Sequence, residues 1–379
     1  MEKSRLSFID YGKALGILFV LMIHAGMSSL NEFVLFAMPL FYIASGYMLN
    51  FQKRDLKQYA KTRFLKLMIP FWTFSALDIL LGTARAYFYR YGTYKIAIPA
   101  LINMAYGSGF KVPDIFGIRE LIVTNIPYVQ PSERFMDVIL PTNCHLWFLP
   151  AMFTASILAF IILKNFKDRK IVLIGLSFVL ILVAALESLP DVAQIPYCIG
   201  RGCIGAVFII VGYFLKEQEF FEKRKMPLKI TVFAVTSVIA LVFIKVLGIH
   251  GEEMVRSQYG SFGIWGAYLT FVGGTAAAIA VLSFFNILEQ VNIGAIGTIL
   301  SSIGQNTMDI YLWQFFGFFV LEIIYFTISG ESAFPDKHWM TVLPPSGTWY
   351  KLVETTLVIT ATVLIKKRMS IGAIKKTPK

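Results

Sequence analysis

The sequence has little charge, little histidine and little cysteine. Charged residues make up 15% of the 379 positions, whereas soluble domains usually hold about 25%. The three cysteines, Cys144, Cys198 and Cys203, form neither a disulfide framework nor a CxxC pair, and we expect them to pack as small apolar residues. No cluster of His, Cys and Asp has the spacing of metal ligands, so the sequence predicts no metal site.

Long apolar runs take the place of charge. Apolar residues make up 56% of the chain. A hydrocarbon core of about 30 Å needs about 20 apolar residues per helix, and helices satisfy their own backbone groups in lipid. We therefore predict an all-α polytopic membrane protein with about ten transmembrane helices, near residues 8–29, 32–50, 68–90, 144–163, 171–188, 198–215, 229–247, 263–287, 304–328 and 349–366.

The positive charges indicate how these helices are oriented. The net charge is +12, but most Lys and Arg residues lie in short segments between apolar runs, as in the positive-inside pattern and unlike a nucleic-acid surface. This predicts both termini in the cytoplasm and one integral-membrane domain over residues 1–379, with a basic cytoplasmic tail at 366–379. Residues 288–303 are expected to form a cytoplasmic loop, and about 91–143 a long outside loop with interfacial or re-entrant pieces.

The first apolar run carries three ionisable residues, Asp10, Lys13 and His24. It lacks the small-residue cleavage site of a signal peptide, so we expect it to remain as a spanning helix. Each such residue costs about 2.5–3.5 kcal/mol to place in a bilayer and is therefore a functional candidate. Lys13 and His24 are eleven residues apart, which puts them on one helical face about 16 Å apart, and Asp10 lies one turn from Lys13 and can pair with it.

This arrangement suits acyl transfer. A histidine is the usual base that takes a proton from a hydroxyl. Lys13, nearer the cytoplasm, and the nearby Arg63 and Lys66 could hold the phosphates of an acyl-CoA. The alternatives are a pore-facing or interhelical hydrogen-bonded histidine with a snorkelling Lys13, and topogenic or lipid-binding roles for Arg63 and Lys66.

Other polar residues lie in or beside the predicted helices. Asp78 and Arg201 fall within apolar runs, where each could form a structural pair or touch a substrate. Trp147 fits an aromatic belt, and its neighbour His145 fits an interfacial position.

Several segments together resemble the membrane acyltransferase-3 family, in particular its branch similar to fucose 4-O-acetylase. RLSFIDYGKALGILFVLMIHAG resembles the family's first helix, with Lys13 where arginine is usual; the charge is kept, but the bidentate geometry of arginine is lost. FAMPLFYIASGYML, RFLKLMIPFW and HLWFLPAMF resemble motifs that follow in the same order. IGQNTMDIYLWQ resembles a late motif that often ends in histidine, and here it ends in Gln314.

The resemblance implies transfer of an acetyl or related acyl group from a cytoplasmic acyl-CoA, as co-substrate, to a hydroxyl of a surface or lipid-linked carbohydrate. It assigns catalysis to His24 and donor binding to Lys13, Arg63 and Lys66. We expect Asp10 as a second catalytic residue, and candidate acceptor-side residues are Ser45, Trp147, Arg201 and Gln314. The expected location is the bacterial cytoplasmic membrane, with lipid, the glycan and a separate extracytoplasmic transfer protein as candidate partners, and no nucleic acid. A transporter or flippase for a lipid-linked sugar is the alternative, although the sequence has no internal repeat of the kind that many transporters show.

Overall fold

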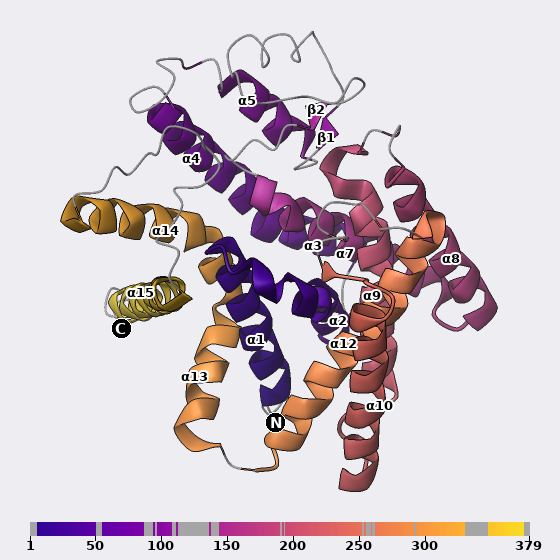
Figure 1. Ribbon diagram of the computed structural model, residues 1–379. Coiled ribbons are helices and arrows are strands. Elements are labelled where there is room, and N and C mark those ends of the chain that lie inside the picture. Colours follow the sequence, from indigo (N-terminus) through magenta and orange to yellow (C-terminus); the bar gives the residue numbers. More distant parts are fainter. Residues whose placement is uncertain are drawn as a thin grey trace.

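The computed structural model describes residues 6–50, 55–86, 94, 97–107, 111–112, 136–137, 144–189, 192, 194–251, 254, 259, 262–291, 293–329 and 348–374. Within these residues the chain is almost entirely helical (Figure 1). The exception is one antiparallel pair of two-residue strands, β1 (Lys111–Val112) and β2 (Met136–Asp137). The all-α prediction is therefore confirmed for the part of the chain that the structure describes.

The helices follow the apolar runs. The first third contains α1 (Ser7–His24), the 3-10 helix η1 (Ser28–Phe36), α2 (Ala37–Tyr47), α3 (Leu56–Arg63), the π-helical turn η2 (Phe64–Met68), α4 (Ile69–Ala86) and α5 (Ala97–Tyr106). The middle contains η4 (Cys144–Trp147), α7 (Phe148–Phe166), α8 (Lys170–Glu187), η5 (Pro196–Cys198), α9 (Ile199–Glu217) and α10 (Met226–Lys245). The last part contains α12 (Ile264–Leu288), α13 (Gly294–Gln305), α14 (Thr307–Ser329) and α15 (Thr348–Ile374).

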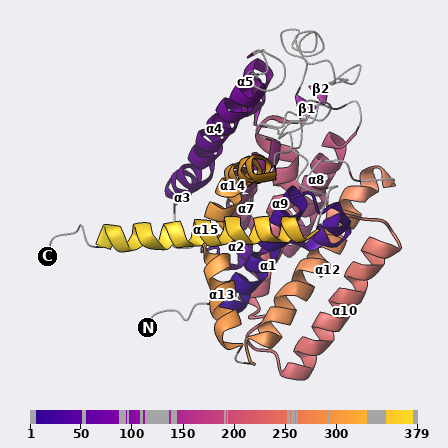
Figure 2. The same ribbon diagram turned by 60° about the vertical axis from the view of Figure 1, so that its left-hand side comes forward.

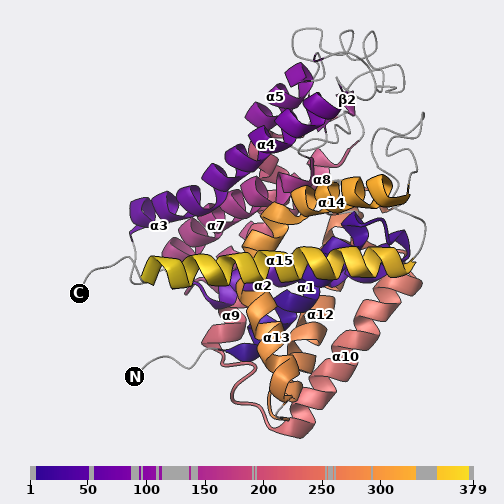
Figure 3. The same cartoon turned by 90° about the vertical axis from the view of Figure 1, so that its left-hand side faces the viewer.

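Eight helical segments of the described chain are long and apolar enough to cross a membrane. They correspond to the first eight predicted spans, and the third is a continuous segment, Leu56–Ala84, through α3, η2 and α4. The ninth prediction falls on α14, in which Thr307–Leu321 is a shorter apolar helix. The tenth falls on α15, which runs across α1 and α13 at a steep angle (Figures 2 and 3). The chain is thus a polytopic helical membrane protein, and the sidedness of its termini stays a prediction.

Two predicted loops contain helices. Residues 288–303 were expected to be a loop, but α13 occupies most of this stretch and packs along α1, so that prediction is wrong. Gly304 allows this packing, since a Cβ there would lie 2.0 Å from the backbone oxygen of Asp10. In the loop predicted at 91–143, α5 is a short apolar helix, and most of the remaining loop lies outside the described residues. The end of the predicted basic tail, from residue 375, also lies outside them.

Helix α1 lies at the centre of the described structure. It contacts η1, α2, α12, α13, α14 and α15, and Figure 1 shows it between α13 and α12. More than half of its residues are buried inside the protein. A polar side chain on α1 therefore contacts other helices more readily than lipid. Ionisable residues within a membrane are tolerated in such a bundle interior.

Helices α2 and α9 approach each other through reciprocal glycines. A Cβ on Gly46 would lie 2.0 Å from the carbonyl oxygen of Ile209, and one on Gly212 would lie 2.1 Å from that of Ile43. Small residues of this kind let transmembrane backbones come into contact, which gains van der Waals packing in the absence of a hydrophobic driving force.

We predict that Gly46→Ala destabilises the protein by about 1–3 kcal/mol, because the added methyl group forces the two helices apart. Gly175→Ala in α8 is the matched control, since a Cβ there meets nothing within 4 Å and alanine favours the helix. Thermal unfolding of the detergent-solubilised variants measures the difference. A Gly46→Ala variant as heat-stable as the Gly175→Ala variant would contradict the close packing of α2 on α9.

Candidate active site

The first helix carries an ion pair at its amino-terminal end. Nζ of Lys13 lies 3.0 Å from Oδ1 of Asp10, as the spacing of the two residues predicts. Asp10 is buried, whereas Lys13 remains half-buried. The buried carboxylate of Asp10 is thus paired with the ammonium of Lys13 and is not an isolated charge. Of the two residues, Lys13 is the more accessible.

His24, the last residue of α1, is held by Gln314 of α14. Nδ1 of His24 lies 2.9 Å from Oε1 of Gln314, whose side chain is fully buried. Nε2 of Gln314 donates a hydrogen bond of 2.9 Å to the backbone oxygen of Tyr311, one turn earlier on α14. That second bond fixes the orientation of the amide, because only its nitrogen can donate to a carbonyl.

The fixed amide determines which nitrogen of His24 carries the proton. Oε1 of Gln314 can only accept, so Nδ1 of His24 must donate to it. In the neutral imidazole this leaves the lone pair on Nε2, which can then take a proton from a substrate. An asparagine orients the histidine of papain-like proteases in the same manner. The His24–Gln314 pair is therefore a base with a defined tautomer.

A second histidine lies close to His24. The ring centroids of His24 and His145 are 6.4 Å apart, and the ring of Phe315 contacts both, at 5.1 Å from His24 and 3.7 Å from His145. The hydroxyl of Tyr311 donates a hydrogen bond to the backbone oxygen of His145. Helix α14 therefore positions both imidazoles.

His145 is paired with Asp78 of α4. Its Nε2 lies 3.2 Å from Oδ2 of Asp78, and His145 is buried rather than interfacial as predicted. Sequence reasoning did not assign either residue to the site. The sequence contained one signal, an acidic residue within an apolar run, which is energetically costly to place in a membrane. This marked Asp78 as a candidate but did not identify its partner.

Two of the three predicted donor-binding residues, Arg63 and Lys66, lie at the junction of α3 and α4. Arg63 donates hydrogen bonds to the hydroxyls of Tyr59 (3.0 Å) and Ser45 (3.1 Å). Ser45 was expected on the acceptor side, but this bond places it beside Arg63. Lys66 is exposed, so its ammonium group is accessible to an anion.

Trp147 and Arg201, two of the predicted acceptor-side residues, are in contact. The guanidinium carbon of Arg201 lies 5.0 Å from the centre of the Trp147 ring, and both side chains are buried. Trp147 therefore packs inside the protein rather than in an aromatic belt. The contact is a cation–π interaction, which is strengthened where water is excluded.

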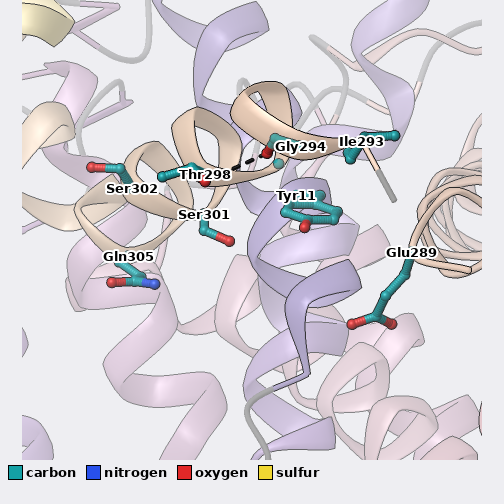
Figure 4. Close-up of a pocket in the computed structure, with 9 residues that line it drawn as sticks. Tyr11, Glu289, Ile293, Gly294, Thr298, Ser301, Ser302 and Gln305 are labelled. Carbon is teal, nitrogen blue, oxygen red and sulfur yellow. Dashed lines mark hydrogen bonds between the residues drawn. The ribbon is translucent and has the colours of Figure 1, made fainter. Parts of the chain in front are cut away.

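One polar pocket of about 430 Å³ lies between α1 and α13. Tyr11, Glu289, Thr298, Ser301 and Gln305 are among its lining residues (Figure 4). Tyr11 is two residues from Lys13 and therefore faces nearly the opposite side of α1. The lining residues include an acid and no Lys or Arg, so this pocket does not suit the phosphates of an acyl-CoA. Among the described residues, no three potential metal ligands are grouped.

The comparisons with known proteins assign the chain to a family. Residues 6–365 match the model of the acyltransferase-3 family, which is described as an acyltransferase domain. The chain therefore belongs to this family and is a membrane acyltransferase. No curated protein and no solved structure matches it.

We predict that Gln314→Met slows acyl transfer by about 10- to 100-fold, because the buried N–H of His24 loses its acceptor. Gln314→His retains more activity, since a ring nitrogen can accept from Nδ1 of His24. Initial rates of CoA release by purified protein, measured over a range of acyl-CoA concentrations, separate this effect from donor binding. A methionine variant with wild-type turnover would show that Gln314 does not orient His24.

Proposed function

We propose that the protein is an O-acyltransferase that moves an acyl group, in the first place acetyl, from cytoplasmic acyl-CoA to a hydroxyl of a carbohydrate of the bacterial cell envelope. The observation that carries the proposal is the orientation of His24 by Gln314, which leaves one basic nitrogen within the helical bundle. Membership of the acyltransferase-3 family supports the reaction class. We do not propose a transporter or flippase, because the acyltransferase-3 family, to which the chain belongs, is a family of enzymes.

The proposed reaction balances with His24 as the proton carrier. Nε2 of His24 takes the proton of the acceptor hydroxyl while the hydroxyl oxygen attacks the thioester carbon. A new C–O bond forms and the C–S bond breaks. The imidazolium then gives its proton to the departing thiolate, so an ester and free CoA leave and the enzyme returns to its starting state. Gln314 keeps its hydrogen bond to Nδ1 through both proton transfers.

Asp10 supports this reaction from a distance. It lies fourteen residues before His24, which is about 21 Å along the helix axis, so it does not reach the reacting atoms together with His24. Its 3.0 Å contact with Lys13 indicates that it positions the cation that holds the donor. We therefore propose Asp10 as a positioning residue.

The donor is proposed to approach along the face of α1 that carries Lys13. Lys13 and His24 share that face about 16 Å apart, and an extended acyl-CoA arm spans a distance of this order. Lys13, Arg63 and Lys66 would attract the CoA phosphates, for which arginine and lysine are suited. The hydroxyl of Ser45, hydrogen-bonded to Arg63 at 3.1 Å, holds the guanidinium in place until a phosphate binds.

We predict that His24→Ala abolishes transfer, with a loss of about 10²- to 10⁴-fold as is typical for a general base. A strain that lacks the gene is complemented with each variant, and the acyl content of its surface glycans is measured by mass spectrometry. His250→Ala is the control, because it removes the same kind of side chain from the segment that follows α10. Restoration of glycan acylation by the His24→Ala variant would refute the assignment of the base.

A further inference from the structure

A polar atom beside the proposed base, Nδ1 of His145, is buried and has no hydrogen-bond partner in the part of the chain that the structure describes. Oγ of Ser75, on the same helix as Asp78, is also buried and without a partner there. Ser75 lies one turn before Asp78 on α4 and is fully buried. Each unsatisfied group of this kind carries a free-energy cost, and native proteins retain few of them. A polar ligand that binds here would remove that cost.

Nδ1 of His145 is part of the surroundings of His24. The rings of His145 and His24 are 6.4 Å apart and share Phe315 as a neighbour. A hydrogen bond to a nitrogen or an oxygen is about 2.8–2.9 Å long. The two rings are therefore close enough for neighbouring hydroxyl groups of one ligand to reach both imidazoles.

The chemistry of the pair favours a hydroxyl. His145 lies 3.2 Å from Asp78, and its free Nδ1 is a donor or an acceptor according to where the shared proton resides. A hydroxyl matches either case, because it can both donate and accept. A phosphate or carboxylate would be repelled by an ionised Asp78. Phe315 adds an apolar surface next to the pair, as the carbon side of a sugar ring requires.

The hydroxyl at His145 differs from the one that reacts. The reacting hydroxyl gives its only proton to His24, and its oxygen lone pair attacks the acyl carbon. It therefore has no hydrogen left for Nδ1 of His145, which is an acceptor when Nε2 donates to an ionised Asp78. We infer that His145 and Asp78 bind a second hydroxyl on the carbon next to the reacting one, so that the acceptor is a vicinal diol of a sugar. This inference rests on the proposed function and names the part of the acceptor that the site recognises.

The position of the acyl group on the natural product tests this directly. Surface glycans from the complemented deletion strain are digested, and the acylated sugar is identified by mass spectrometry and NMR. The expected product carries the ester next to a carbon with a free hydroxyl. An ester whose neighbouring carbons carry only glycosidic bonds, amides or hydrogens overturns the inference while leaving the proposed function intact. A glycan pool without any enzyme-dependent ester contradicts both.

Variants of the pair provide a second test. We expect Asp78→Asn and His145→Gln to lower glycan acylation at least tenfold, while the affinity for acetyl-CoA, measured by titration of the purified protein, changes less than twofold. Asp168→Asn, an exposed aspartate between α7 and α8, is the control and retains full acylation. Full acylation by both site variants would overturn the inference. An equal loss of acetyl-CoA affinity would also overturn it, because it would show a structural or donor-side role.

Discussion

The hydrogen bond between His24 and Gln314 is the contact on which the rest of the site depends. It joins the end of the first helix to α14, 290 residues later in the chain. The bond can form only if α14 packs against α1, and α13 leads it there by lying along α1 with Gly304 against the backbone of Asp10. The amide of Gln314 is in turn held by Tyr311, whose hydroxyl also reaches His145. A single turn of α14 thus sets the tautomer of one histidine and the position of another.

The membrane explains why these polar groups are arranged in pairs. Inside a helical bundle in lipid, each polar group needs a partner because water is scarce. Asp10 meets Lys13, His24 meets Gln314, His145 meets Asp78, and Arg201 lies on Trp147. The differences between the pairs are informative. His24 has a neutral partner and one nitrogen available, whereas His145 has an acidic partner and an atom still unsatisfied. The first arrangement suits a proton carrier, and the second suits a binding group.

Sequence reasoning succeeded where the information is local. The lengths of the apolar runs predicted the first eight spans, and helical periodicity predicted the Asp10–Lys13 contact. Prediction from the sequence failed where the packing of helices against one another decides the structure. Residues 294–305 carry no charge to mark a membrane boundary, so their helix was taken for a loop.

The partners of His24 and His145 could not be predicted from local patterns either. Gln314 was predicted as an acceptor-side residue, in place of a histidine that the family often has, and not as the partner of His24. The contact between His145 and Asp78 joins two apolar runs that are separated by a long loop. No periodicity relates such distant residues, and only the packing of α14 against α1 and α4 brings them to one site.

The central claim is that a donor bound from the cytoplasm reaches a single oriented nitrogen of His24. A cryo-electron microscopy structure with a non-transferable thioether analogue of acetyl-CoA tests it most directly. The account predicts that the analogue lies along the Lys13 face of α1, with its carbonyl carbon next to Nε2 of His24 and Nδ1 still bound to Gln314. An analogue bound elsewhere, such as between α1 and α13, or a His24 ring whose Nδ1 faces the carbonyl carbon, would contradict it.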